Sequence, residues 1–445
     1  MYDPLYHQSP GCGQDYPNSY WAQVSGSSPK NLGALQTDLE VDVAIIGAGY
    51  TGMSCALHLA EEHGIKATLL EANQSAWGCS GRNAGFILKT SGRKSFSQMA
   101  NQWGEQAMRA TYQEMAEGVE RVKGLIARGI DCDMQPAGYL KVAHKPNKLN
   151  ELRAIAQLQK DMFGYDIDVL SKDDVRQQFM DDRNAHGAIR YTDGFGLNPL
   201  KLAWGYQNLA TSAGADIYCS TPVLQSRQSS TGFELITPSA LVKAKKVVLA
   251  TNGYTPQGFM PAVNNRYLPV LSQIIVTEPM SEQQLSDSGI KTNQVVMDTR
   301  ALKYYYRKLP DNRILFGGRG AISGKSAQDP YYANRLLSVL KSSFPALESL
   351  NIAYAWSGWI CMSLDDIPHI YQNAEQNLFY SMGYCGAGVS FSAQAGKRLA
   401  DKVAGAQVPN IPLYTSPLPT FPFAPLRRVG QWGYFQYGKI KDKYF

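Results

Sequence analysis

VDVAIIGAGYTGMSCALHLAEEHGIKATLLE, residues 41–71, contains the pattern from which the architecture of this chain can be predicted. Residues 41–46 are an apolar, β-branched run, as expected of a parallel strand that is covered on both faces. A G-x-G-x-x-G turn follows at 47–52, residues 53–62 have apolar positions at helical spacing, and residues 67–71 form a second apolar run. The stretch therefore predicts a strand, a helix and a second parallel strand.

The glycine turn of this unit is typical of a dinucleotide site. Gly47 permits a tight turn, Gly49 lets backbone N–H groups approach a pyrophosphate, and Gly52 lets the helix pack on the strand. The positive helix N-terminus favours the diphosphate. Glu71, at the end of the second strand, would accept hydrogen bonds from ribose hydroxyls and repel a 2′-phosphate. The predicted ligand is the ADP part of NAD or FAD rather than NADP; the alternative is a glycine turn in another α/β protein.

A second glycine-rich turn lies near the C-terminus, at residues 383–390, between an apolar run at 377–382 and a helical pattern at 391–404. One dinucleotide has one pyrophosphate, so a second helix N-terminus would face a different electronegative group. The N1/C2=O edge of a flavin fits, because that edge becomes more negative on reduction.

Composition and charge exclude several classes of protein. The 445 residues are 44% hydrophobic and 18% charged, as in a folded globular chain. The net charge of +6 is spread along the chain, which argues against nucleic acid. Seven cysteines without C-x-x-C argue against a disulfide framework and a zinc site, and the six histidines lack ligand spacing, so no metal is expected. The start lacks a secretory pattern and no apolar run reaches about 18 residues, so we expect a cytoplasmic protein without a transmembrane segment.

Six short motifs along the chain carry a resemblance to a known family. They are SYWA (19–22), GAGYTG (47–52), WGCSGRNAG (77–85), VLATNGYT (248–255), WSG (356–358) and GYCGAG (383–388). Nearly end to end, the chain resembles the D-amino-acid-oxidase-like, FAD-dependent oxidoreductases, and within them the γ-glutamylputrescine oxidase-like branch. The resemblance implies FAD as the cofactor.

The resemblance also implies a set of cofactor contacts. Ser80, Arg82, Asn83 and Gly85 would lie along the flavin end, Val223 near the adenine, and Gly358 with residues 383–389 beside the isoalloxazine. The full predicted set is Gly47, Gly49, Tyr50, Thr51, Gly52, Glu71, Ala72, Gly78, Ser80, Arg82, Asn83, Ala84, Gly85, Val223, Thr251, Asn252, Gly253, Gly358, Gly383, Gly386, Gly388 and Val389. Arg82 could instead be a surface cation, and Val223 an ordinary core residue.

The implied fold is α/β, with a Rossmann-like FAD-binding domain and a discontinuous substrate domain built from a mainly antiparallel sheet and helices. Residues 38–95, 195–255 and 355–405 are assigned to the first domain, 96–194 and 256–354 to the second, and 406–445 to a C-terminal extension. Within them we expect a continuous helix at 98–128, further helices at 149–162 and 199–213, and a hairpin formed by 301–309 and 313–316.

The chemistry implied by the resemblance is oxidation of a carbon next to an amine. Hydride passes to the flavin, water hydrolyses the imine, and oxygen reoxidises the flavin and gives peroxide. No acid or base is needed, so no catalytic residue is assigned. Amino-acid-oxidising relatives have G-x-R-P at the flavin-facing strand, but this chain has Gly358, Trp359, Ile360 and Cys361. Ile360 cannot bind a carboxylate, which favours an amine such as a polyamine derivative.

Tyr304, Tyr306, Trp359 and Ile360 are the predicted substrate pocket. Tyr304 and Tyr306 share one face of a strand, while Tyr305 and Arg307 share the other. The alternatives are sheet packing for the tyrosines, core packing for Trp359, and a carboxylate clamp formed by Arg307.

Cys361-Met362 resembles the Cys-Met that carries covalent flavin in sarcosine-oxidase-like relatives, but the residues after it do not match. An inert buried cysteine is the more ordinary interpretation.

Three functions follow as hypotheses. The first is an amine oxidase that uses oxygen. The second is an amino-acid oxidase or dehydrogenase that passes electrons to a carrier. The third is a flavoprotein subunit that docks on a partner or a membrane through residues 412–445, which are rich in proline, aromatic residues and cations. The alternative for this tail is an extension packed over the body with its cations outward.

Overall fold

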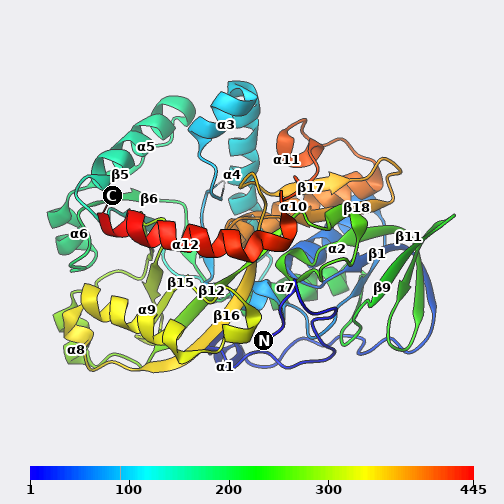
Figure 1. The fold of residues 1–445 in the computed structure, drawn as a ribbon, viewed down its shortest axis with the longest axis horizontal. Helices are drawn as coiled ribbons and strands as arrows, with labels where there is room; N and C mark the ends of the chain where they lie inside the picture. Colours follow the sequence, from blue (N-terminus) through cyan, green and yellow to red (C-terminus); the bar gives the residue numbers. More distant parts are fainter. Residues whose placement is uncertain (91, 445) are drawn as a thin grey trace.

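The computed structural model describes residues 1–90 and 92–444, and its strands form two large sheets joined by a shared core (Figure 1). The first sheet has the order β17-β18-β11-β1-β2-β8, with the hairpin β9-β10 on the edge of β11. Its strands are β1 Leu39–Ile46, β2 Ala67–Leu70, β8 Asp216–Tyr218, β9 Gln225–Ser229, β10 Gly232–Ile236, β11 Leu241–Leu249, β17 His369–Gln372 and β18 Leu378–Met382. The four central pairings, β18-β11, β11-β1, β1-β2 and β2-β8, are parallel.

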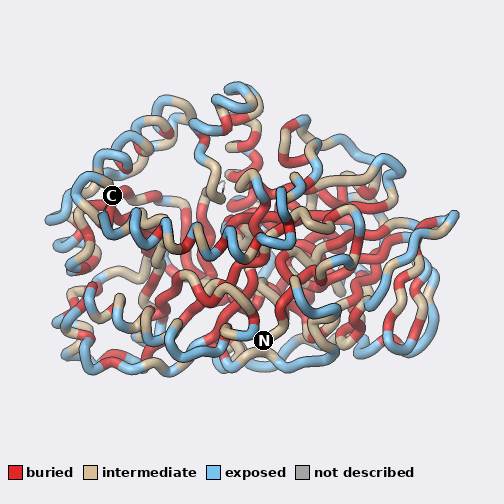
Figure 2. Tube along the Cα trace, in the orientation of Figure 1, coloured by how far each residue is buried: buried red, intermediate tan, exposed pale blue. Residues whose placement is uncertain are grey.

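The apolar run in β1 exists because both faces of this sheet are buried. Val43 and Ile45 pack among the helices, whereas Ala44 and Ile46 pack on the other side, with the β9-β10 hairpin and the loop around Tyr267. Figure 2 shows these central strands as buried. The predicted βαβ unit is confirmed.

The second sheet has the order β16-β12-β15-β14-β13-β4-β6-β5, and every pair except β13-β4 is antiparallel. This confirms the predicted mainly antiparallel sheet. Its strands are β4 Tyr139–Val142, β5 Asp168–Leu170, β6 Ala188–Tyr191, β12 Leu268–Thr277, β13 Val295–Asp298, β14 Tyr305–Lys308, β15 Ile314–Arg319 and β16 Ile352–Met362; β3 Phe86–Ile87 and β7 Phe195–Gly196 form a small third sheet.

The helices pack around the two large sheets, and α5 ends within one residue of its predicted end. They are α1 Tyr20–Val24, α2 Tyr50–His63, α3 Phe96–Trp103, α4 Glu105–Ala127, α5 Lys148–Phe163, α6 Lys172–Gln178, α7 Pro199–Ser212, α8 Glu282–Ser288, α9 Pro330–Ser343, α10 Gly388–Ala404, α11 Pro412–Thr415 and α12 Arg427–Tyr444. The predicted helix at 149–162 is confirmed as α5, which Gly164 ends with a left-handed φ of 64°. No helix in the described residues combines the length and apolar character that crossing a bilayer needs.

One predicted element is wrong, and one predicted domain boundary falls within a strand. The helix expected at 98–128 is two helices, α3 and α4, because Gly104 between them takes φ 82° and ψ 161°, which is outside the helical region. Residues 355–362, predicted to belong to the first domain, form part of β16, which pairs with β12 in the second sheet. The other domain boundaries stay predictions.

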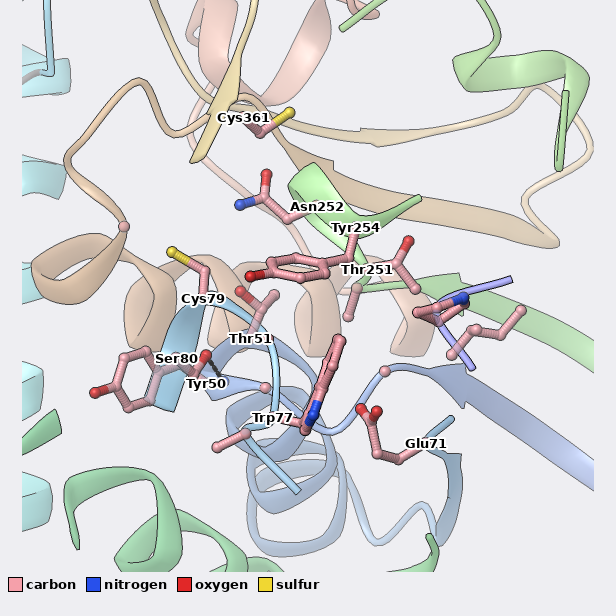
Figure 3. Close-up of a pocket in the computed structure, with 18 of the residues that line it drawn as sticks. Tyr50, Thr51, Glu71, Trp77, Cys79, Ser80, Thr251, Asn252, Tyr254 and Cys361 are labelled. Atoms are coloured by element: carbon pink, nitrogen blue, oxygen red, sulfur yellow. Dashed lines mark hydrogen bonds between the residues drawn. The ribbon is translucent and has the colours of Figure 1, made fainter. Parts of the chain in front are cut away.

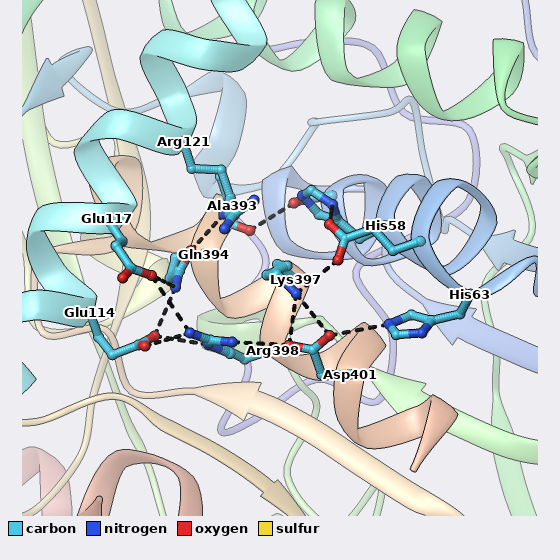
Figure 4. A network of polar contacts seen from close by, with 12 residues as sticks. His58, His63, Glu114, Glu117, Arg121, Ala393, Gln394, Lys397, Arg398 and Asp401 are labelled. Atoms are coloured by element: carbon cyan, nitrogen blue, oxygen red, sulfur yellow. Dashed lines mark hydrogen bonds and ion pairs between the residues drawn. The ribbon is translucent and has the colours of Figure 1, made fainter. Parts of the chain in front are cut away.

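An ion network holds α2, α4 and α10 together beneath the first sheet (Figure 4). Glu114 on α4 accepts hydrogen bonds from Nε and Nη2 of Arg398, at 3.0 and 2.5 Å. Arg398 also pairs with Asp401 at 3.1 Å, and Lys397 bridges Asp401 and Glu62 at 2.9 Å each. His63 adds a 3.1 Å contact to Asp401, so the carboxylates of this cluster are balanced by side-chain cations.

The C-terminal helix α12 lies across the front of β12, β15 and β16 in Figure 1. Arg427 donates to the carbonyl of Tyr267 at 2.6 Å, and Arg428 pairs with Asp3 at 2.8 Å. These two cations therefore point inward, which corrects the expectation that the tail would turn its cations outward; Lys439, Lys441 and Lys443 are exposed.

Candidate functional site

A cavity lies between the N-terminus of α2 and the carboxyl ends of β1, β2 and β11 (Figure 3). Its free space, including the open mouth, is about 1270 Å³. This is the edge at which open α/β sheets bind ligands, because the loops leaving parallel strands diverge there. The first glycine turn forms its floor.

The turn and the helix that follows it are tightly joined. Gly47 has a φ of 104°, a conformation that side chains rarely adopt. A Cβ at Gly52 would lie 2.1 Å from the carbonyl oxygen of Gly47, so the first turn of α2 rests directly on the loop. Gly49 caps α2 without a side-chain bond, and the Tyr50 N–H donates to Ser80 Oγ at 3.0 Å. The first-turn amides that have no helical partner can bind an anion such as a pyrophosphate.

Glu71 lies beside this turn and points into the cavity (Figure 3). Its carboxylate accepts from the backbone N–H groups of Ala48 at 2.9 Å and Asn73 at 3.0 Å. Burial raises the pKa of Glu71, and these N–H groups partly oppose the rise. A carboxylate offers about four acceptor positions, so two remain for ribose hydroxyls.

The 77–85 loop is shaped by its own polar side chains. Arg82 donates from Nε to the Trp77 carbonyl at 2.7 Å and stacks 4.2 Å above the Trp77 ring. The Asn83 amide donates to Ser80 O at 2.8 Å and accepts from the Gly85 N–H at 2.8 Å. Arg82 is buried rather than exposed, which excludes the surface-cation alternative.

The opposite wall comes from the second glycine turn and the segment after β11. Thr51 Oγ1 lies 2.6 Å from the hydroxyl of Tyr384, which links α2 to this turn. Asn252 Oδ1 accepts from the Gly383 N–H at 3.2 Å. The helix α10 begins at Gly388 with no side-chain cap, so its N-terminus faces the cavity uncapped.

The cavity brings most of the predicted cofactor residues together. Gly47, Gly49, Tyr50, Thr51, Glu71, Ala72, Gly78, Ser80, Asn83, Val223, Thr251, Asn252, Gly386, Gly388 and Val389 line it. Gly52, Arg82, Ala84, Gly85, Gly253, Gly358 and Gly383 lie outside the lining, although a Cβ at Gly253 would lie 3.1 Å from the carbonyl carbon of Ile360. These residues lie behind the residues that line the cavity.

The predicted substrate residues divide between the two faces of the second sheet. Ile360 lines the cavity. Tyr304 and Tyr306 pack on the other face among the residues beneath α9, where the Tyr306 hydroxyl donates to Asp182 at 2.7 Å. Trp359 is fully buried with Trp77 and donates to the Tyr2 carbonyl at 2.8 Å. Tyr304, Tyr306 and Trp359 therefore do not line the cavity, which corrects the prediction. The alternation of side chains along a strand predicts which residues share a face, but which face meets the cofactor depends on tertiary packing.

Arg307 and Cys361 are both buried. Arg307 donates to the carbonyls of Ala84 and Leu197, so it joins the 77–85 loop to the segment before α7 and is not free to bind a carboxylate. Burial, with Cys385 nearby, raises the pKa of the Cys361 thiol, which disfavours the thiolate. Cys361 lines the cavity, so a covalent flavin link stays a prediction, although the raised pKa of the thiol does not favour it.

The sequence reasoning omitted several lining residues. Tyr254 and Tyr384 line the cavity, and both lie within glycine-rich motifs that could have indicated them. Pro10, Pro222 and Phe259 also line it, but they come from loops with no recognisable pattern.

Comparison with known proteins agrees with this site. The family described as FAD dependent oxidoreductase matches residues 42–402. Gamma-glutamylputrescine oxidoreductase of Escherichia coli (strain K12) is 33% identical over 393 residues, 88% of this chain and 90% of that protein. Two crystal structures share the fold. L-Proline dehydrogenase from P. horikoshii has a TM-score of 0.70 at 19% identity, covering 84% of this chain and 96% of that one.

The other is dithionite-reduced L-alpha-glycerophosphate oxidase from Mycoplasma pneumoniae, solved with FAD bound. It has a TM-score of 0.66 at 15% identity and covers 85% of this chain and 99% of that one. Of the two dinucleotides that the first glycine turn allowed, the cofactor is FAD. The chain belongs to the FAD-dependent oxidoreductase family and is an oxidoreductase of that family.

Proposed function

We propose that this enzyme oxidises a primary amine of a polyamine derivative such as γ-glutamylputrescine. The carbon loses a hydride and the neighbouring nitrogen a proton, which is two electrons and two protons in total; oxygen takes them up as hydrogen peroxide, and water converts the imine to an aldehyde and ammonia. When bound, FAD supplies the hydride acceptor and the reaction with oxygen. The relative with 33% identity, named for this substrate, supports the choice.

The observation that carries the proposal is the position of Ile360. It lines the cavity on the same strand face as Gly358, because the two are separated by one residue in β16. An isoleucine there offers an alkyl wall to a methylene chain and no clamp for an α-carboxylate. That favours an amine over an α-amino acid.

The cavity also lacks an obvious acid or base. Of the residues that line it, Glu71 is the sole carboxylate, and neither histidine nor lysine is present among the described lining residues. Burial raises the pKa of Tyr254 and of Tyr384 to about 12 each, so neither phenol is a base at neutral pH. These observations support a reaction in which the protein only positions the substrate and stabilises the cofactor.

The same proposal assigns the cofactor's parts to the cavity walls. Glu71 would hold the adenosine ribose, the α2 N-terminus the pyrophosphate, and Val223 the adenine. The N-terminus of α10 would stabilise negative charge on the flavin edge. The uncapped ends of both helices support this arrangement.

An anaerobic titration with γ-glutamylputrescine tests the function. We expect the visible absorption of the flavin to bleach and, on admission of air, to return with about one peroxide per substrate. Bleaching by an α-amino acid, without recovery in air, would instead support a dehydrogenase that uses a carrier. If γ-glutamylputrescine leaves the band unchanged, this substrate assignment is wrong.

Ile360→Arg is expected to shift the specificity. The new guanidinium would offer a bidentate partner to an α-carboxylate, so binding of L-amino acids should tighten about tenfold, as expected of charge-assisted hydrogen bonds. Oxidation of the amine should weaken, because the same cation repels an ammonium. Ile360→Met, which keeps the volume without the charge, is the matched control. Equal amino-acid binding by the two variants in a flavin difference spectrum would contradict the assignment of Ile360 to the substrate wall.

The C-terminal extension does not change this proposal. Trp432, Tyr437, Ile440 and Tyr444 on α12 are exposed, and Lys439, Lys441 and Lys443 are also exposed on that helix. Docking on a partner or a membrane through this face stays a prediction, as does a cytoplasmic location.

A further inference from the structure

Two cations lie on the face of the second sheet that carries Gly358 and Ile360. Arg319, at the end of β15, is paired in register with Ser272 on β12, and Ser272 is paired with Gly358 on β16. These three residues form one row across three strands, so their side chains share a face. In the next row, Tyr305 is paired with Met297 and Met297 with Lys141 on β4. The hydroxyl of Tyr305 lies 2.6 Å from Ser272 Oγ, which connects the two rows.

Lys303 is a third cation in this region. It lies in the short segment between β13 and β14, and its ammonium group interacts electrostatically with Lys141, Arg319 and Arg93. Burial first, and then these cations, lower the pKa of Lys303 to about 8; Asp298 opposes them. Burial also lowers the pKa of Lys141 and of Arg319. Lys303 therefore lies near the other cations, and Lys141, Lys303 and Arg319 are each half-buried.

Neighbouring cations have partners that these three lack. Arg93 donates to the Tyr434 hydroxyl at 2.6 Å and pairs with Asp366 at 3.3 Å, and Lys89 pairs with Asp193 at 2.6 Å. Within residues 1–90 and 92–444, the charged groups of Lys141, Lys303 and Arg319 take part in no hydrogen bond or salt bridge. Unpaired cations in a shielded position cost stability. Glu151 and Asp298 favour the charged forms of Lys141 and Lys303 without forming ion pairs with them. Three cations without a direct partner leave donors free for an anionic ligand such as a carboxylate.

The helix α12 covers this part of the sheet. Phe435 packs with Val270 and Ile360, and Gly438 lies against Leu302. The carboxylate of Asp442 accepts from the backbone N–H groups of Ala301 and Leu302, at 2.6 and 3.0 Å. The segment that carries Lys303 is therefore fixed by α12, and the cations are shielded from solvent on that side.

We propose that Arg319, Lys303 and Lys141 form an anion subsite that binds a carboxylate at the far end of the amine substrate. Gly358 and Arg319 are two strand spacings apart, about 10 Å. The carboxylate would thus lie several bonds from the carbon that is oxidised, as in a γ-glutamyl amide of putrescine and unlike an α-amino acid. A free diamine would bring a second cation to the same place without a carboxylate to offset it, so it should bind more weakly. The assignment of the ligand to the substrate rests on the proposed function.

Titration of the holoenzyme with glutarate tests the subsite without turnover. Glutarate is expected to perturb the flavin absorption and to release heat on binding, whereas glutaramide is not. Lys303→Met and Arg319→Met should each weaken glutarate binding about tenfold or more, as expected when a charge-assisted contact is lost. Arg319→Lys should restore most of the affinity. Lys325→Met removes an exposed cation elsewhere and is the charge-matched control.

Steady-state kinetics then separate this subsite from the proposed function. With γ-glutamylputrescine, the KM of Lys303→Met and Arg319→Met should rise about tenfold with little change in kcat. With the decarboxylated analogue N-(4-aminobutanoyl)putrescine, whose far end carries an ammonium group and no carboxylate, the KM of the variants should not rise and should fall if the ammonium reaches the subsite. If γ-glutamylputrescine is not oxidised but glutarate binding follows the cations, only the proposed function fails. The anion subsite is overturned if the unmodified enzyme does not bind glutarate. It is also overturned if all variants with a normal flavin spectrum bind glutarate equally well.

Discussion

Gly52→Ala is expected to yield a protein that retains less than about a tenth of its FAD and is destabilised by about 3 kcal/mol, as in severe overpacking. The added Cβ would lie 2.1 Å from the Gly47 carbonyl oxygen and 3.3 Å from the Cγ2 of Ile45. The nearest atom belongs to the backbone, so no side-chain rotation relieves the clash. The start of α2 must move away from the glycine turn, and its first-turn amides then leave the position where a pyrophosphate would bind.

The measurement is the ratio of visible flavin absorption to protein absorption after purification, together with calorimetric unfolding. Gly124→Ala is the matched control, because Gly124 lies within α4, is exposed, and has no atom within 4 Å of an added Cβ. That change should leave the FAD content intact and stabilise the fold by about 0.5–1 kcal/mol. A Gly52→Ala protein with full FAD content would show that α2 does not form the diphosphate site.

The parts of the site that the sequence predicted well are local ones. The βαβ unit follows from one strand, one helix and one turn that are adjacent in the chain, and its helix ends at Gly64 in the left-handed conformation. Glu71 is placed by the same unit, because it directly follows β2. The second glycine turn, at 383–390, was predicted in the same way from its flanking strand and helix. The predicted cofactor residues at 78–85, 223, 251–253 and 358 have no such local unit and depend on the resemblance of short motifs to a family.

The parts that failed depend on distant segments. Tyr304 and Tyr306 were separated correctly from Tyr305 by strand parity, but α9, which buries them, comes later in the chain. The inward position of Arg428 depends on Asp3, from the opposite end of the sequence. Gly104 interrupts a continuous helical pattern, and its φ could not be read from that pattern. The three cations could not be grouped from the sequence either, since strand pairing places Lys141 and Arg319 on one face of the sheet and Lys303 lies in a separate loop.

Glu114→Gln is expected to lower the free energy of unfolding at pH 7 by about 3 kcal/mol, the range for breaking a buried ion pair. The Glu114 side chain is 4% exposed. Its carboxylate accepts from Arg398, from Gln394 Nε2 at 2.8 Å and from the Tyr414 hydroxyl at 2.5 Å. A neutral amide weakens all of these contacts and leaves Arg398 with only Asp401 and the more distant Glu117. Chemical denaturation followed by circular dichroism measures the loss.

Glu120→Gln is the control on the same helix. Its side chain is 67% exposed and pairs with Lys123 at 2.7 Å. Exposed pairs of this kind contribute little, so the change should cost less than about 0.5 kcal/mol. Equal losses for the two variants would mean that the network around Arg398 does not stabilise the packing of α4 on α10.

The effect of Glu114 should also depend on pH in a defined direction. Burial alone would raise the pKa of Glu114, but the hydrogen bonds from Arg398, Tyr414 and Gln394 hold it below its ordinary value of 4.5. A carboxyl group with a lowered pKa stabilises the fold fully above that ordinary value, and the contribution disappears as the pH falls through the lowered one. The stability difference between the unmodified protein and Glu114→Gln should therefore be constant near neutrality and shrink below about pH 4.5. A difference that grows on acidification would mean that the pKa of Glu114 is raised in the native state, and Arg398 would then be held mainly by Asp401 and the more distant Glu117.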